Sequence, residues 1–322
     1  MLLLSAVLCV YVYRMPESVA DPLPVLMYHH MVPDGQDCND MTVTPGKFRS
    51  DLDAILAKGY TPVLPRELAA GDALPEKPIL ITFDDGYRSN YDLVYPILRE
   101  YGVKACISII VLMPDLPTDN FCTWNQLREM TASGLVEIGS HSYRLHNLGG
   151  DGGNFESGGA NGVERRPNES DTDFQTRVLD DIQLSHDRIA EELGGVTCFA
   201  YPFGCSDPDA KTLVDELFPV TLMTMPKCAD LADGLHDLPR FTVTMKTDLE
   251  NSCADHTSPP ACASTQAGAF VFSRSGSLAA YFLLRTTIVP PLTFCQQSFK
   301  IVKRPPCEGF VSPGSPGSDR SR

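Results

Sequence analysis

The sequence predicts an α/β protein in which helices cover a sheet of parallel strands. Continuously apolar segments of three to nine residues recur between residues 24 and 243, which is typical of strands buried on both faces. Amphipathic segments with helix-capping residues separate them, so strand and helix alternate along the chain. Six or seven such units in about 230 residues suit a β/α barrel, while an open, doubly wound sheet is the competing topology.

The elements are expected in the following order. Strands are predicted at 24–28, 79–83, 104–112, 136–139, 197–201, 220–223 and 241–243. Thr44-Pro45 opens a helix that Gly59 ends, because threonine caps a helix, proline fits its first turn and glycine terminates it. Thr123 caps another helix, which stops at Gly134. Further helices are expected through Leu93, Ile97 and Leu98, over 173–193 and over 208–217.

Composition and charge restrict the function. Apolar residues make up 43% of the chain and charged residues 21%, which allows a packed core. With 26 Lys+Arg against 41 Asp+Glu the net charge is −15, which argues against a nucleic-acid binder and favours a neutral or cationic partner such as a sugar polymer. The last 69 residues have a net charge of +4 and the first 253 have −19. The 11 cysteines show no C-x-x-C pair, which argues against a disulfide scaffold.

Both ends of the chain differ from the α/β region. Residues 1–13 are almost continuously apolar, but a membrane span needs about 20 residues. We therefore interpret residues 1–21 as the remnant of a signal or signal-anchor with a linker, a buried strand being the alternative. Residues 22–250 form the α/β domain. Residues 251–322 contain three Pro-Pro pairs and end in Ser, Pro, Gly and Arg, which predicts an irregular tail with no assigned function.

Polar motifs follow two of the expected strands, at the end where the active site of a β/α barrel lies. Residues 82–86 read T-F-D-D-G, and two adjacent carboxylates are costly there unless a metal ion or another charge uses them. A helix-capping turn is the alternative. Residues 140–146 read S-H-S-Y-R-L-H. Two histidines and one aspartate form a common donor set for a divalent metal ion, which acidifies bound water.

Two weaker motifs also end strands. Residues 199–204 read F-A-Y-P-F-G, and the backbone N–H groups of this turn could face a developing oxyanion. Residues 27–30 read M-Y-H-H, and one of these histidines could give a proton to a leaving group. Each motif taken alone is more often structural than catalytic. Their occurrence together with the Asp-Asp and His-His motifs favours an active site.

The four motifs in this order resemble the polysaccharide deacetylase family (the NodB-homology domain, carbohydrate esterase family four). The L-M-Y-H-H segment and the five-residue histidine spacing are similar to its poly-N-acetylglucosamine deacetylase branch. The resemblance covers residues 22–250, which makes this region the catalytic domain. It implies a distorted (β/α) barrel with about seven parallel strands. It also implies a divalent metal ion, with zinc expected and cobalt, nickel or iron as alternatives.

The family implies a hydrolase that removes N-acetyl groups from a cell-surface or cell-wall polysaccharide of N-acetylglucosamine type and releases acetate. An O-acetyl esterase acting on xylan or another acetylated glycan is the alternative, and an inactive glycan-binding homologue is a third. The enzyme would be exported to the cell surface or the extracellular space, with membrane anchoring through residues 1–21 as a further option. The oligomeric state is not predicted.

The resemblance assigns roles to individual residues. The metal ligands would be Asp85, His141 and His146. Asp84 would be the general base, and His29 the general acid with His236 as the second choice.

Other residues would support these groups. The Tyr201 backbone N–H would hold the oxyanion. Ala200 stands where many family members have an arginine, so Arg240 would supply the charge that orients the base. Contacts with the substrate are expected from Tyr143, Pro202 and Phe203. Stacking on a sugar ring is expected most from Tyr143 and Tyr201, with Tyr87 and Trp124 as further aromatic candidates.

Overall fold

The computed structural model describes residues 22–71, 73–146, 162–166 and 168–252 of the 322-residue chain. The predicted N-terminal segment 1–21 and nearly all of the predicted tail 251–322 lie outside the described residues. Within the described ranges, no helix is both long and apolar enough to cross a membrane.

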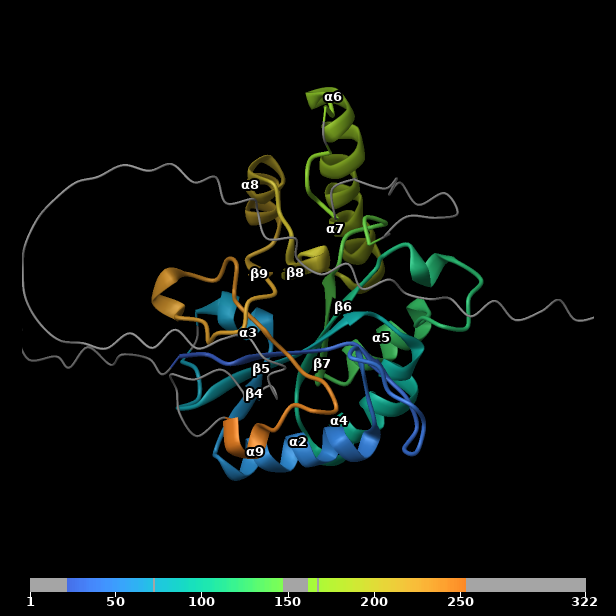
Figure 1. Ribbon diagram of the computed structural model, residues 1–322. Coiled ribbons are helices and arrows are strands. Elements are labelled where there is room, and N and C mark those ends of the chain that lie inside the picture. The colour runs from blue at the N-terminus through green and yellow to red at the C-terminus, as the bar shows by residue number, and fades with distance from the viewer. Residues whose placement is uncertain (1–21, 72, 147–161, 167, 253–322) are drawn as a thin grey trace, which may run out of the picture. The chain divides into compact units, whose positions relative to one another are not determined.

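The sheet contains seven parallel strands on one continuous path, in the order β10-β1-β5-β6-β7-β8-β9 (Figure 1). Their bounds are β1 Val25–Tyr28, β5 Pro78–Asp85, β6 Ala105–Ile109, β7 Val136–Ser140, β8 Cys198–Ala200, β9 Val220–Leu222 and β10 Phe241–Thr242. Each corresponds to a strand predicted from the sequence. Three short strands were not predicted: β4 (Thr61–Val63), which pairs with the first half of β5, and the pair β2 (His30–Met31) and β3 (Thr42–Val43).

The segment after β9 joins the two edges of this sheet. Leu238 forms a parallel bridge with Leu222 of β9, and three residues later Phe241 pairs with Leu26 of β1. One short stretch of chain therefore contacts the last strand and then the first. This connection makes the architecture a distorted barrel and not an open, doubly wound sheet, as the sequence predicted.

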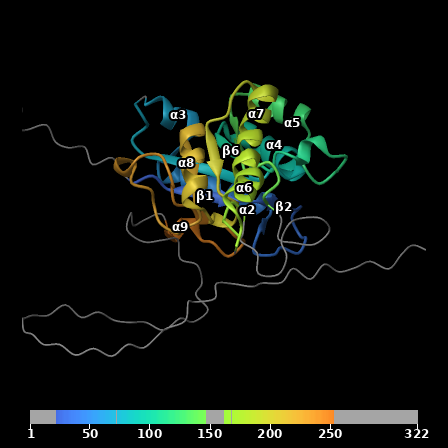
Figure 2. The ribbon, with the colours of Figure 1, turned by 90° about the horizontal axis from the view of Figure 1, so that it is seen from above.

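Most helices cover the outside of the sheet, whereas one short helix places Leu68 in the same apolar cluster as Val25 and Leu80 of the strands (Figures 1 and 2). Their bounds are α2 Pro45–Ala57, α3 Pro65–Ala70, α4 Tyr95–Tyr101, α5 Trp124–Ala132, α6 Asp171–Phe174, α7 Asp180–Leu193, α8 Pro208–Leu217 and α9 Leu249–Ser252. A π-helical segment, Asn90–Val94, directly precedes α4. A second π-helical segment, Gln175–Leu179, joins α6 to α7. As predicted, Thr44 caps α2 by accepting from the Lys47 N–H, and Thr123 caps α5.

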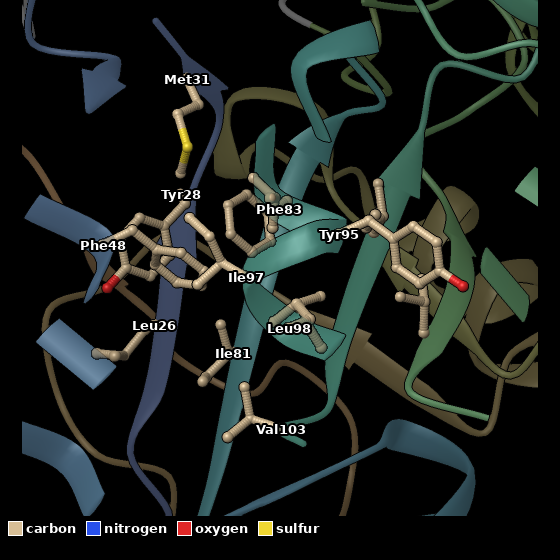
Figure 3. Close-up of a cluster of buried hydrophobic side chains, with 14 of the residues drawn as sticks. Leu26, Tyr28, Met31, Phe48, Ile81, Phe83, Tyr95, Ile97, Leu98 and Val103 are labelled. Carbon is tan, nitrogen blue, oxygen red and sulfur yellow. The ribbon is translucent and has the colours of Figure 1, made fainter. Parts of the chain in front are cut away.

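Alternate side chains of the strands enter two separate apolar clusters, as the period of two in a strand requires. The outer cluster packs β1 and β5 against α2 and α4, and it includes Leu26, Tyr28, Phe48, Ile81, Phe83, Ile97 and Leu98 (Figure 3). The inner cluster includes Val25, Leu80, Cys106, Cys198 and Leu222. Each large side chain buried in this way contributes about 1.5–3 kcal/mol to folding, so the strand ends rest on a firmly packed base.

Candidate metal centre and catalytic groups

Asp85, His141 and His146 come together at the carboxyl ends of the strands. One potential ligand atom from each lies within 4.8 Å of the others. The Nε2 atom of His146 is 3.4 Å from Asp85 Oδ1, and that of His141 is 3.8 Å from the same oxygen. Asp85 ends β5 and His141 directly follows β7, two strands away in the sheet. Parallel strands end at the same edge, which explains why Asp85 and His141, 56 residues apart in the sequence, share one site.

The backbone of Asp85 turns its carboxylate toward the histidines. In a regular strand the side chain of Asp85 would lie on the same face as that of Phe83, which is in the outer apolar cluster. Asp85 instead has a φ of +73°, a left-handed conformation that is unfavourable for a residue with a side chain. Gly86 follows with a φ of +77°, and a Cβ atom there would lie 2.6 Å from Ile109 Cγ2. Glycine is therefore required for the turn that presents Asp85.

A carbonyl group fixes the tautomer of His141. Its Nδ1 lies 2.7 Å from the Ala200 carbonyl oxygen, which can only accept, so Nδ1 carries the proton and Nε2 presents its lone pair toward Asp85. Burial lowers the pKa of His141 to about 4, against the opposing charge of Asp84. The imidazole is thus neutral at pH 7, which is the form that binds a metal ion.

The loop that carries both histidines is held by hydrogen bonds. The Ser142 hydroxyl accepts from the Leu145 N–H at 3.0 Å, and Ser142 itself has a φ of +68°. From α7, the buried carboxylate of Asp181 accepts from the N–H groups of Tyr143 and Arg144 at 2.8 and 3.2 Å. Burial raises the pKa of Asp181 to about 7, although these N–H groups act in the opposite direction.

Asp181 was not singled out from the sequence. A signal was present, because Asp181 lies three residues after Val178 and four before Ser185, which places it on the buried face of the long helix. A carboxylate on such a face must have a partner.

The three residues fit a divalent metal ion. Asp85 Oδ1 is buried and accepts no hydrogen bond from any described residue. Buried polar atoms in folded proteins normally have a partner, so this oxygen calls for one. Two imidazole nitrogens and one carboxylate oxygen form an N/O donor set that zinc and similar ions accept, with positions left for water and substrate.

Asp84 points to the inside of the barrel, where Arg240 meets it. Two N–H groups of Arg240 donate to the two carboxylate oxygens, each at 2.8 Å, and the guanidinium also donates to the Met223 carbonyl at 3.1 Å. Burial alone would raise the pKa of Asp84, but the charge and hydrogen bonds of Arg240 outweigh it and hold that pKa well below its usual range. The expected contact between these two residues is present, and it keeps Asp84 ionised.

The structure brings His29, but not His236, close to these carboxylates. His29 is buried, and burial lowers its pKa, while the charges of Asp84 and Asp85 act to raise it. His236 has a side chain that is 42% exposed, and its Nδ1 lies 3.7 Å from an oxygen of Asp215 on α8.

The third motif lies differently from the prediction. The Tyr201 N–H donates to the Leu222 carbonyl of β9 at 3.0 Å, so it is engaged in the sheet and is not available to an oxyanion. The Tyr201 side chain is fully buried among apolar residues, which also excludes stacking on a sugar. The motif by itself does not distinguish the strand-bonded amide from the amides of the following turn.

Phe203 takes a position beside the metal ligands. Its ring lies on that of His146, with the centroids 4.4 Å apart and an angle of 29° between the planes. It has a φ of +60°, and no described residue accepts a hydrogen bond from its N–H. Pro202 is buried and Tyr143 is half-buried against the outer cluster. The contacts of Tyr143, Pro202 and Phe203 with a substrate stay predictions.

The chain is thus a distorted β/α barrel domain with an Asp-His-His group, able to hold a divalent metal ion, at the carboxyl ends of its strands. Residues 71–217 match the model of the polysaccharide deacetylase family. Over residues 71–217 the chain therefore matches the polysaccharide deacetylase family, which confirms the resemblance found in the sequence for that part of the chain.

Two curated relatives illustrate the match. Poly-beta-1,6-N-acetyl-D-glucosamine N-deacetylase of Escherichia coli (strain K12) is 31% identical over 138 residues, which are 38% of this chain and 20% of the relative. The chain thus spans about a fifth of the length of that relative. A Bacillus subtilis (strain 168) protein named as a polysaccharide deacetylase, YxkH, is 26% identical over 227 residues, which are 69% of this chain and 71% of the relative.

Solved structures show the same fold. A de-N-acetylase from Aggregatibacter actinomycetemcomitans superposes with a TM-score of 0.60 at 25% identity, covering 71% of this chain and 97% of that one. IcaB from Ammonifex degensii gives a TM-score of 0.58 at 26% identity, covering 70% and 93% of the two chains.

Proposed function

We propose that this protein is a metal-dependent hydrolase that removes N-acetyl groups from a polysaccharide of N-acetylglucosamine type and releases acetate. The observation that carries the proposal is the Asp85–His141–His146 group, in which Asp85 and His141 are buried, beside an ionised carboxylate, Asp84. A divalent ion held by this group, for which we expect zinc, would supply Lewis-acid polarisation of the acetamide carbonyl and acidify a water molecule.

Asp84 acts as the general base. Its carboxylate is ionised at neutral pH because Arg240 pairs with both oxygens. It accepts a proton from the water that attacks the carbonyl carbon of the acetamide. Arg240 does not touch the substrate in this scheme, and its role is to hold the carboxylate in place and in its charged form.

The charge that develops on the carbonyl oxygen needs a donor from the chain. We assign this to the Phe203 N–H in place of that of Tyr201, because the Tyr201 amide is engaged with Leu222 and no described residue accepts from the Phe203 amide. An amide fixed in a turn of this kind stabilises an oxyanion without reorganising. The stack of Phe203 on His146 keeps this turn beside the metal ligands.

We assign protonation of the departing amine to His29. Burial lowers the pKa of His29, so its ring is neutral in the free protein and would first take up the proton that Asp84 removes from the attacking water, and then pass a proton to the amine. His29 is buried and within electrostatic range of Asp84 and Asp85, whereas His236 pairs with Asp215. Protonation of the nitrogen allows the C–N bond to break, giving acetate and a free amino group on the sugar.

The substrate class rests on the relatives. The Escherichia coli protein is named for poly-beta-1,6-N-acetyl-D-glucosamine, and we infer a related N-acetylated glycan for this chain. Action on such a glycan fits an exported enzyme. Export or anchoring through residues 1–21 stays a prediction, because that segment lies outside the described residues.

Acetate release tests the proposal. Purified protein loaded with zinc, cobalt or nickel is incubated with β-1,6-linked and β-1,4-linked N-acetylglucosamine oligomers and with acetylated xylan. We expect acetate from an N-acetylglucosamine oligomer, and none after chelation or in Asp84→Asn. Faster release from acetylated xylan would instead indicate an O-acetyl esterase, and no release with any metal would exclude catalysis.

A further inference from the structure

A groove beside the candidate active site has no role in the scheme above. It has a volume of about 540 Å³, which lies within the usual range of roughly 300–1,000 Å³ for small-ligand sites. Its walls include the side chains of His30, Met31, Tyr87 and Phe121, and its rim includes those of Asp92 and Asn120.

Residues on two walls of the groove are neighbours in sequence of proposed catalytic or metal-binding residues. His30 directly follows His29, the residue to which we assign the acid role. Tyr87 lies two residues after the proposed metal ligand Asp85 and close enough for burial and the charge of that carboxylate to raise the pKa of the Tyr87 hydroxyl. An opening whose two walls both continue from the reacting centre is placed to hold the part of a substrate adjoining the reacting group.

Backbone hydrogen bonds hold these walls in place. Tyr87 and Phe121 form an antiparallel bridge, flanked by bonds from the Arg88 N–H to the Asn120 carbonyl at 2.8 Å and from the Cys122 N–H to the Gly86 carbonyl at 3.0 Å. On the other side, the Met31 N–H donates to Ser89 Oγ at 3.1 Å, and buried Asn90 donates to the His29 carbonyl at 3.1 Å. Walls fixed in this way lose little entropy when a ligand binds.

The aromatic rings form one wall. Tyr87 and Phe121 stack with their centroids 5.2 Å apart and their planes 15° from parallel. The His30 ring lies 4.7 Å from that of Tyr87 at 50°. Phe121 and His30 are half-buried, so part of each ring remains accessible. The apolar face of a pyranose ring packs on an aromatic surface of this kind, while carboxylate and amide groups at the rim can bond to its hydroxyls.

We propose that this groove is a subsite that binds the sugar unit adjoining the one that is deacetylated, by packing it against Phe121. The proposal rests on the proposed function, because it takes the substrate to be an N-acetylated glycan chain. It means that the protein selects a chain of linked sugars over a single N-acetylglucosamine.

The first test measures binding without turnover. In the metal-loaded Asp84→Asn protein, the affinities for N-acetylglucosamine and for its β-1,6-linked tetramer are measured by calorimetry or ligand-observed NMR. The added change Phe121→Leu should weaken tetramer binding by about 3- to 10-fold, the size of an aromatic contact, and leave the monosaccharide unchanged. Phe121→Tyr, which keeps the ring, should restore tetramer binding. Unchanged tetramer affinity in the Phe121→Leu variant, or equal loss for both sugars, overturns the subsite.

The second test separates this inference from the proposed function. Acetate release from the tetramer is measured in two proteins that retain Asp84, one with Phe121 intact and one with the change Phe121→Leu. A fall in kcat/KM matching the loss of affinity supports both proposals. Tetramer binding that depends on Phe121, without any acetate release, supports the subsite and excludes deacetylation of that glycan. Acetate release with binding that is independent of Phe121 supports deacetylation and excludes the subsite.

Discussion

Two buried carboxylates at opposite ends of the barrel strands, the upper (carboxyl-end) level and the lower (amino-end) level, have pKa values that are shifted in opposite directions. Near the carboxyl ends of the strands, Asp84 pairs through both oxygens with buried Arg240. Near the amino end of β7, Glu137 is also buried, but its hydrogen bond comes from the Arg66 backbone N–H at 3.0 Å, and the half-exposed Arg66 guanidinium is 4.0 Å away. Arg240 holds the pKa of Asp84 low despite burial, whereas burial raises the pKa of Glu137.

The difference shows that burial by itself does not make a functional carboxylate. Both acids are removed from water to a similar degree, but the pKa of the paired one is lowered and that of the other is raised. The upper level also holds His29 and the Asp85–His141–His146 group that we propose as the metal site. At the lower level, burial raises the pKa of Glu137, which favours its neutral form.

Loss of the metal ion should produce the largest effect, and only at the upper level. Chelation should abolish acetate release because it removes the metal ion, and His146→Ala should do so because it removes one of the three ligands. Added zinc should restore the chelated parent but not the variant. It should also raise the melting temperature of the parent and of Glu137→Gln alike. Full activity after exhaustive chelation, with metal content checked by mass spectrometry, would contradict the assignment.

The same chemical change at the two levels should separate catalysis from structure. Asp84→Asn should lower kcat by about 10²–10⁴-fold, the usual contribution of a general base. Glu137→Gln, which also turns a carboxylate into an amide, should leave kcat unchanged. Steady-state kinetics on an N-acetylglucosamine oligomer provides the measurement. Similar losses of kcat in both variants would contradict the assignment of a catalytic role to Asp84 and of a structural role to Glu137.

Removal of the paired cation should destabilise the protein more than removal of the exposed one. Arg240→Gln leaves Asp84 buried without its partner and should cost about 3–5 kcal/mol of unfolding free energy at pH 7. Arg66→Gln, at a half-exposed arginine, should cost about 0–1 kcal/mol. Urea unfolding at pH 7 compares the two variants. A small cost for Arg240→Gln would mean that Asp84 has another partner.

The pH dependence of stability should have opposite signs at the two levels. The pKa of Asp84 is lowered by folding, so its contribution is present above about 3.8 and is lost as the pH falls through the folded pKa. The pKa of Glu137 is raised, so the folded protein loses stability as the pH rises above about 4.5. Relative to the parent, Glu137→Gln should therefore become more stable between pH 4.5 and 7, which urea unfolding at several pH values will show.

Much of this arrangement could be predicted from the sequence. The alternation of apolar strands and capped helices indicated the barrel, and one aspartate and two histidines that follow two strands indicated the candidate metal site. These patterns are local, so they are visible in a single sequence. The ion pair between Arg240 and Asp84 was also expected, although only through the resemblance, because 156 residues separate the two partners.

Other features depend on contacts that no local pattern records. The engagement of the Tyr201 amide follows from the register between β8 and β9, and the stack of Phe203 on His146 follows from a left-handed turn at a non-glycine residue. Strand β4 was missed because it has three residues, one of which is Pro62.

The segment from Leu238 to Phe241, which joins the two edges of the sheet, also carries Arg240, the ion-pair partner of Asp84. Arg240 lies between Leu238, which contacts β9, and Phe241, which pairs with β1. During synthesis on the ribosome, the strand bearing Asp84 emerges long before this segment. The ion pair between Asp84 and Arg240 can therefore form only after nearly all of the barrel has been synthesised. Closing a loop of 156 residues is slow compared with forming neighbouring strand pairs. The pairing with Arg240, which holds the proposed general base in its charged form, can therefore form only late in synthesis.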